Sequence, residues 1–371
     1  MLINYRNLNF TSNNYSNPKL LEKPNVTLNN YFTSKSISFG CRMLAFFSKP
    51  CEQTDIEKAQ VNFRKELLND ADNSFKKQSK EGREFSDGIN KIHSWESLQG
   101  LRARGNPDGW GIIGYQDKGS KINMLQEKET DPAYASKNYD NAVKQVLNKP
   151  SPIIVAHIRL DGNKSYPGIN NIQPFTYKNW SMMINGRVEI NESTKLLNDL
   201  NKYDKKYSLK PTGTVGDEKA LYYFLGKMKD NNLNLEDPNL KVQDIQHSYA
   251  EAINDINTAI PYITQKINGK IMNITGEIET SPAFNIITSN GNILMAYANG
   301  PKLFVGAYKL NNGEKEYIIS SEVIQPRQNQ FNKNIEWSEI PKGHILTLYK
   351  NNKDEIVAEI KPLKKLLQEE L

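Results

Sequence analysis

The chain has 371 residues, of which 37% are hydrophobic and 24% charged, and its net charge is +6 at pH 7. These values are typical of a globular protein with one large domain or two ordinary ones. No apolar run approaches the roughly 20 residues of a membrane-spanning helix, so we predict no membrane association. Residues 1–40 carry +3 of the net charge, and the remainder lacks the basic stripe that nucleic-acid binding needs.

Residues 1–40 are rich in Asn, Ser and Thr, and their apolar residues follow no period. This composition predicts a flexible leader or propeptide. It contains no continuous apolar segment of the kind that a secretory signal needs. The composition changes at Cys41, and we predict a single domain over 41–371.

The first half of the domain alternates between short apolar runs and helical spacing. We expect a strand at "CRMLAFFS" (41–48), helical structure over 54–80, and a hairpin from "GWGIIGYQD" (109–117) and "KINMLQE" (121–127). A short helix at 140–149 and a buried strand at "SPIIVAHIRL" (151–160) follow. "WSMMINGRVEI" (180–190) indicates a strand that breaks at Asn185–Gly186.

The second half contains two helices, over 217–229 and 246–266, and then mostly antiparallel strands. Turn residues divide 283–298, 302–321 and 344–360 into three strand pairs. Strands therefore occupy both ends of the domain, with helices grouped between them. This distribution predicts an α+β fold in which helices cover antiparallel sheets.

Cysteine and histidine are scarce. Two cysteines exclude a disulfide scaffold and indicate a reducing compartment, so we predict a cytoplasmic protein. The four histidines show no zinc-type spacing, and we predict neither a metal nor a cofactor.

Cys41 allows two interpretations. At the start of an apolar run it is an ordinary buried thiol, the commonest place for a free cysteine. Gly40 before it leaves room for the thiol to attack the preceding carbonyl, and hydrolysis would then give Cys41 a free α-amine. An amine with a pKa of about 8 beside a thiol is a general base next to a nucleophile.

Other polar positions also allow more than one interpretation when each is considered alone. Arg159 shares a strand face with His157; the two point to solvent or an internal ion pair, or the guanidinium binds a carboxylate. Asn185–Gly186 is either a type I′ turn or an oxyanion hole made of the side-chain amide and a backbone N–H. Asp217 suits the positive N-terminal end of a helix.

In combination, these positions and their flanking residues resemble the class II glutamine amidotransferases, which are N-terminal-nucleophile hydrolases, and especially their small stand-alone bacterial branch. The resemblance is carried by Cys41, "NPDGWGIIGY" (106–115), "IVAHIRLDG" (154–162), "NNIQPF" (170–175), "WSMMINGRV" (180–188) and "GDEKALYYFL" (216–225). It continues through "NIITSNGNILMAY" (285–297) and "IISSEVI" (318–324). It thus covers nearly all of the domain.

The resemblance implies a four-layer αββα sandwich and a role for each singled-out residue. Cys41 would be the nucleophile, with its own α-amine as the base, and Asn185 and Gly186 would form the oxyanion hole. Arg159 would bind the α-carboxylate of glutamine, and Asp217 its α-ammonium. The products would be ammonia and, through a γ-glutamyl thioester, glutamate.

Two positions depart from the family pattern, because Gln173 and Ile184 stand where relatives usually have histidine. Relatives also usually carry the cysteine directly after the initiator methionine, whereas here residues 1–40 must first be removed. The substrate could be another γ-glutamyl amide, and the ammonia acceptor or synthase would be on another chain. The alternatives are an N-terminal-nucleophile amidase for a different amide, and an unprocessed pseudoenzyme or interaction module. We predict that the second cysteine, Cys51, is an ordinary buried or surface thiol.

Overall fold

The computed structural model describes residues 41–49, 54–80, 84–86, 89–91, 105–117, 122–149, 151–160, 168–186, 188, 190–259, 265–267, 270–272, 284–327 and 335–369. All of them belong to one compact unit, Ser38–Leu371. The predicted leader (1–40) and Cys51 lie outside the described residues.

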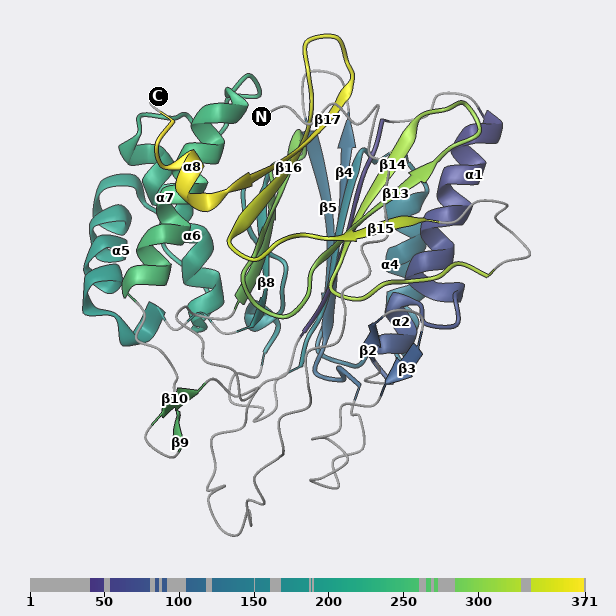
Figure 1. Ribbon diagram of the computed structural model, residues 1–371, viewed down its shortest axis with the longest axis horizontal. Coiled ribbons are helices and arrows are strands. Elements are labelled where there is room, and N and C mark those ends of the chain that lie inside the picture. The colour runs from purple at the N-terminus through teal and green to yellow at the C-terminus, as the bar shows by residue number, and fades with distance from the viewer. Residues whose placement is uncertain are drawn as a thin grey trace, which may run out of the picture. The chain divides into compact units, whose positions relative to one another are not determined.

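The first large sheet has seven strands in the order β15-β13-β14-β1-β6-β4-β5 (Figure 1). They are β1 (Arg42–Phe47), β4 (Trp110–Asp117), β5 (Ile122–Glu129), β6 (Ile153–Ile158), β13 (Phe304–Lys309), β14 (Lys315–Ser320) and β15 (Glu336–Glu339). β1 and β6 lie side by side and antiparallel, with Met43 opposite His157. Both strands are covered on two faces, which explains why their sequences are nearly continuous apolar runs.

The second large sheet has six strands in the order β17-β16-β12-β11-β8-β7. They are β7 (Phe175–Tyr177), β8 (Trp180–Gly186), β11 (Phe284–Ser289), β12 (Ile293–Ala298), β16 (His344–Lys350) and β17 (Ile356–Pro362). All neighbouring pairs are antiparallel. The predicted strand pairs of the last third are therefore confirmed, although β13 and β14 join the first sheet and the others the second.

The two sheets pack face to face on an apolar core. Alternate residues of β1 and β6, such as Met43, Ala45 and Val155, meet Met183, Ile287 and Leu294 of the second sheet. A polar contact also crosses the core, since the Tyr115 hydroxyl donates to Ser181 Oγ at 2.6 Å. This interface matters for function because residues at the ends of its strands face one another across it.

Helices cover the outer face of each sheet (Figure 1). On the first sheet these are α1 (Thr54–Lys65), continued by a π-helical turn (Glu66–Asp70), α2 (Phe75–Gln78) and α4 (Lys137–Leu147). On the second they are α5 (Thr194–Tyr207), α6 (Gly216–Asp230), α7 (Val242–Ala259) and α8 (Leu363–Leu366). Serine caps begin three of them: Ser74 Oγ accepts the Lys77 N–H, Ser136 Oγ the Tyr139 N–H and Ser193 Oγ the Leu196 N–H.

The four layers confirm the predicted αββα sandwich. The remaining short elements are β2 (Glu84–Ser86), β3 (Ile89–Lys91), β9 (Gln265–Ile267), β10 (Lys270–Met272) and the 3₁₀ turns Ile169–Asn171 and Ile190–Glu192. The helix predicted over 246–266 was wrong at its end, because α7 stops at Ala259 and residues 265–267 form strand β9. Helix α5 was not predicted. No helix within the described segments has both the length and the apolar character needed to cross a membrane.

Candidate functional site

Cys41 lies directly before β1, at the end of the interface between the sheets. Strand alternation puts it on the face of Met43 and Ala45, toward the second sheet. Its side chain is buried, with 7% exposed. The thiol lies against the backbone of Leu160, whose N–H points at Sγ from 3.5 Å and whose carbonyl oxygen is 3.9 Å away.

Burial raises the pKa of the Cys41 thiol to about 11. The hydrogen bond from the Leu160 backbone opposes this rise. The Asp217 carboxylate raises the pKa further, whereas Arg159 and Arg42 lower it. Charges of both signs thus act on this sulfur, and at neutral pH it is a protonated thiol.

The raised pKa predicts the reactivity of the thiol in chains that still carry residues 1–40. Because the thiolate is the nucleophile, iodoacetamide labelling of Cys41 should be slow at pH 7 and accelerate about tenfold per pH unit up to about pH 10. A Cys51→Ser variant leaves Cys41 as the sole thiol. Intact mass spectrometry measures the labelling of full-length and shortened chains separately. Equal labelling rates at pH 7 and pH 9 in the full-length chains would contradict the prediction.

The residues after the late strand β14 hold the start of β1 in place. Ser321 Oγ accepts the Met43 N–H at 3.0 Å, and Ser321 N–H donates to the Met43 carbonyl at 3.0 Å. On the opposite face of β1, Arg42 pairs with the buried Glu322 carboxylate, with 2.5 Å between Nη2 and Oε1. The "SSE" segment was noted in the sequence without a role. Its contacts suggest that it positions Cys41.

Arg159 follows β6 and is opposite Cys41 in the strand register, because Arg42 pairs with Ile158. Its N–H donates to the Gly109 carbonyl at 2.9 Å, and its carbonyl accepts the Asp108 N–H at 3.2 Å. Gly109 has φ of +117°, and a Cβ there would lie 2.6 Å from Ile172 Cδ1. The turn at "NPDG" (106–109) therefore closes the end of β6 beside Cys41.

His157 shares the face of Arg159, as predicted, but that face is the interface between the sheets and not solvent. The imidazole is fully buried, and burial lowers its pKa to about 3. His157 is therefore neutral at physiological pH and unsuited to general-base chemistry there.

Asn185 is the residue before the last of β8 and lies on the face that looks toward the first sheet, the face of Met183. Only 1% of it is exposed, and its Oδ1 finds no hydrogen-bond partner among the described residues. Gly186 follows with φ of +115°, a backbone conformation that favours glycine. The pair does not form a hairpin turn, because both residues still pair with β11.

Asp217 lies in the first turn of α6, which begins beside the end of β8. Its Oδ1 accepts the Val188 N–H at 3.3 Å, and its Oδ2 accepts the Gln173 side-chain amide at 3.1 Å. Gly216 makes this approach possible, since a Cβ there would lie 2.1 Å from the Val188 carbonyl oxygen. The carboxylate is thus fixed at the end of the second sheet, where its charge acts on Cys41.

Gln173 is a site residue to which the sequence assigned no role. Its Nε2 donates to Asp217, and its Oε1 accepts the Ile184 N–H at 2.5 Å. The side chain, of which 4% is exposed, therefore joins Asp217 to the strand that carries Asn185. The sequence signal that could have identified Gln173 as a site residue is its position within the motif "NNIQPF".

If glutamine is the substrate, as the sequence resemblance implies, we expect Gln173→Leu to raise the KM for glutamine about tenfold, because one hydrogen bond to the charged Asp217 is lost. Steady-state kinetics measure the change. Gln126→Leu is the matched control, since Gln126 Nε2 donates to the Pro174 carbonyl at 3.2 Å and anchors the same segment without contacting Asp217. Equal effects of the two substitutions would show that Gln173 only anchors the segment.

In the described part of the chain, no group of three or more His, Cys, Asp or Glu side chains is placed to hold a metal ion.

Comparison with known proteins gives a family match. The family model described as "Glutamine amidotransferases class-II" matches residues 88–309, which is more than half of the chain. The match begins after Cys41, so the role of Cys41 depends on the geometry above. No curated protein matches the chain.

Solved structures that a structure comparison matches to this chain include a glutamine aminotransferase class-II domain protein from Silicibacter pomeroyi. It is 15% identical with a TM-score of 0.45, and the match covers 87% of this chain and 99% of the other. A predicted glutamine amidotransferase from Pseudomonas aeruginosa is 13% identical with a TM-score of 0.41, covering 87% and 98%. A glutamine phosphoribosylpyrophosphate amidotransferase from B. subtilis is 10% identical with a TM-score of 0.44, covering 87% of this chain and 49% of that one.

Proposed function

The chain belongs to the class II glutamine amidotransferases, a family of glutamine-amide-hydrolysing enzymes, and we propose that it hydrolyses glutamine or a close γ-glutamyl amide through a thioester on Cys41. The observation that carries this proposal is that Arg159 and Asp217, with opposite charges, both act on the Cys41 thiol. A free amino acid head group has the complementary pair of charges. A guanidinium suits its α-carboxylate, and a carboxylate suits its α-ammonium.

The proposed first step is attack of Cys41 Sγ on the side-chain amide carbon of the substrate. The α-amine of Cys41 takes the thiol proton, and the carbonyl oxygen becomes an oxyanion stabilised by the Asn185 amide and the Gly186 N–H. Collapse of this intermediate breaks the C–N bond, and the nitrogen leaves as ammonia with the proton from the α-amine. Water then attacks the thioester, which releases glutamate and restores the thiol.

The α-amine exists only after residues 1–40 are removed, and we propose that Cys41 itself removes them. Its thiol attacks the Gly40 carbonyl, the peptide nitrogen becomes the α-amine, and water hydrolyses the resulting thioester. Support comes from Gly40, whose missing side chain leaves room for the thiol to approach the preceding carbonyl.

A substrate panel tests the activity. L-glutamine should release ammonia and glutamate in equal amounts, and a γ-glutamyl amide should react by the same route. Turnover of simple acyl amides without turnover of glutamine would instead support an amidase for another amide. No turnover of any of them by chains that begin at Cys41 would refute the proposal.

N-terminal mass analysis tests the processing step. Purified wild type should begin at Cys41, and Cys41→Ala should keep residues 1–40. Cleavage of both chains would point to an external protease. A wild type that stays full length would support a pseudoenzyme or interaction module, because it would have no α-amine at Cys41. The cytoplasmic location and an acceptor or synthase subunit on another chain stay predictions.

A further inference from the structure

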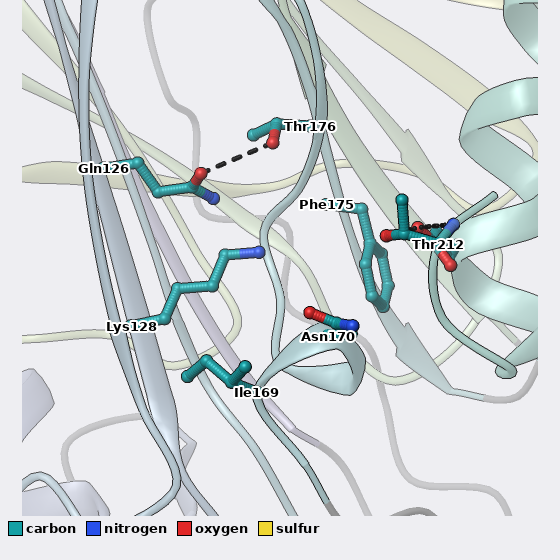
Figure 2. Close-up of a pocket in the computed structure, with 8 residues that line it drawn as sticks. Gln126, Lys128, Ile169, Asn170, Phe175, Thr176 and Thr212 are labelled. Atoms are coloured by element: carbon teal, nitrogen blue, oxygen red, sulfur yellow. Dashed lines mark hydrogen bonds between the residues drawn. The ribbon is translucent and has the colours of Figure 1, made fainter. Parts of the chain in front are cut away.

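A pocket lies beside the candidate site, between the edge strand β5 and the start of α6 (Figure 2). Its volume of about 350 Å³ is within the range of small-molecule sites. The polar residues that line it are Gln126, Lys128, Asn170, Thr176, Thr212 and Glu218. None of them has a role in the proposed reaction.

Lys128 supplies the positive charge of this pocket. It is opposite Gly111, which is opposite His157, so it lies on the face of the first sheet that looks toward the second. Figure 2 shows the side chain reaching from β5 into the space near Thr176, Phe175 and Asn170. Nζ lies 5.8 Å from the centre of the Phe175 ring. Within the described residues it forms no hydrogen bond and no ion pair.

Burial lowers the pKa of Lys128 to about 8, although the charge of Glu218 opposes this. Glu218 forms no ion pair with the lysine; its carboxylate is held by the loop before α6 instead. Its oxygens accept the Thr212 N–H at 2.9 Å, the Thr212 hydroxyl at 2.9 Å and the Gly213 N–H at 2.6 Å. A largely buried ammonium without a counter-ion is costly, and an anionic ligand would relieve that cost.

The walls of the pocket are braced by hydrogen bonds. Asn171 Oδ1 accepts the Thr214 N–H at 3.1 Å, which joins the 3₁₀ turn before β7 to the loop before α6. Thr176 and Gln126 bond each other at 3.4 Å. The pocket is therefore formed before any ligand binds, which lowers the entropic cost of binding.

The pocket and the Cys41 site are separate but adjacent. The segment Gln173–Pro174 runs between them, with its carbonyl groups toward β4 and β5 and the Gln173 side chain toward Asp217. Two consecutive residues of α6 belong to different sites: the charge of Asp217 acts on Cys41, and Glu218 lines the pocket.

We propose that this pocket binds a small polyhydroxylated monocarboxylate of the sugar-acid class, with its carboxylate on Lys128. A single ammonium matches one negative charge, and the nearby Glu218 carboxylate disfavours a dianion such as phosphate. The amides of Gln126 and Asn170 and the hydroxyls of Thr176 and Thr212 offer donors and acceptors for the ligand's hydroxyl groups.

Isothermal titration calorimetry with D-gluconate at pH 8 tests this assignment. We use the Cys41→Ala chain, so that the result does not depend on amide hydrolysis or processing. Gluconate should bind with uptake of about half a proton, because Lys128 is about half neutral at that pH and becomes fully charged on binding. Sorbitol has similar hydroxyl groups but no carboxylate, and should bind at least about tenfold more weakly.

Lys128→Met in the same background should weaken gluconate binding at least about tenfold, and Lys128→Arg should restore part of it. Lys137→Met, which removes an exposed lysine at the start of α4, should have no effect. Three results would each overturn the proposal: no gluconate binding at about 10 mM, equal affinity with and without Lys128, or tighter binding of inorganic phosphate.

Discussion

Cys41→Ala should reduce glutamine hydrolysis at least about 10⁴-fold, to the background level. Without the sulfur no thioester forms, because alanine offers no nucleophile at this position. The substitution removes one buried sulfur atom, whose polar contacts among the described residues are two long ones to the Leu160 backbone. We therefore expect the fold to survive.

Ammonia release at saturating glutamine measures the loss of hydrolysis, and circular dichroism measures whether the fold survives. To separate loss of the nucleophile from loss of processing, the alanine chain is also expressed from residue 41 onward after a cleavable tag. Cys51→Ser is the matched control, because it removes the other thiol of the chain and should keep wild-type turnover. Turnover by Cys41→Ala within tenfold of wild type would show that Cys41 is not the nucleophile.

Asn185→Ala should lower kcat about 10²–10³-fold and change KM little, as expected when a donor to a developing oxyanion is removed. Its effect on stability should be small. Asn185 is buried with an Oδ1 that has no partner among the described residues, and such a group is a cost to the folded state. Asn185 would thus be a residue that turnover requires and folding does not.

Asn285→Ala is the control for this prediction, because Asn285 is the direct neighbour of Asn185 on β11. Its amide is fully used: Nδ2 donates to the Pro301 carbonyl at 2.7 Å, and Oδ1 accepts the Asn299 and Gly300 N–H groups. We expect Asn285→Ala to lose about 1–3 kcal/mol of unfolding free energy in urea titrations and to keep most turnover. If Asn185→Ala were the destabilising variant and kept its kcat, the oxyanion assignment would fail.

The elements of this fold could largely be predicted from the residue pattern. The strands of the late hairpins alternate or end at Asn- and Gly-containing turns, and these local signals depend only on neighbouring residues. The end of α7 was misjudged for the same reason. Helical spacing continues toward residue 266, and the contacts that instead pair β9 with β10 come from outside that window.

The candidate site was predicted as a set of motifs, and its geometry was not. Spacing in the sequence says nothing of how close Cys41 and Asp217 lie, because strand order and register decide which chain segments become neighbours. Gln173 and the Arg42–Glu322 pair illustrate this, since each contact joins residues that are distant in sequence.

Local chemistry therefore sufficed for the strands, most helices and the identity of the polar residues at their ends. The packing of two sheets decided the rest: a buried thiol with a raised pKa, a neutral His157, and, among the described residues, an amide oxygen without a hydrogen-bond partner and a lysine without an ion pair. Burial and long-range charge set these properties, and both exist only once the layers have assembled.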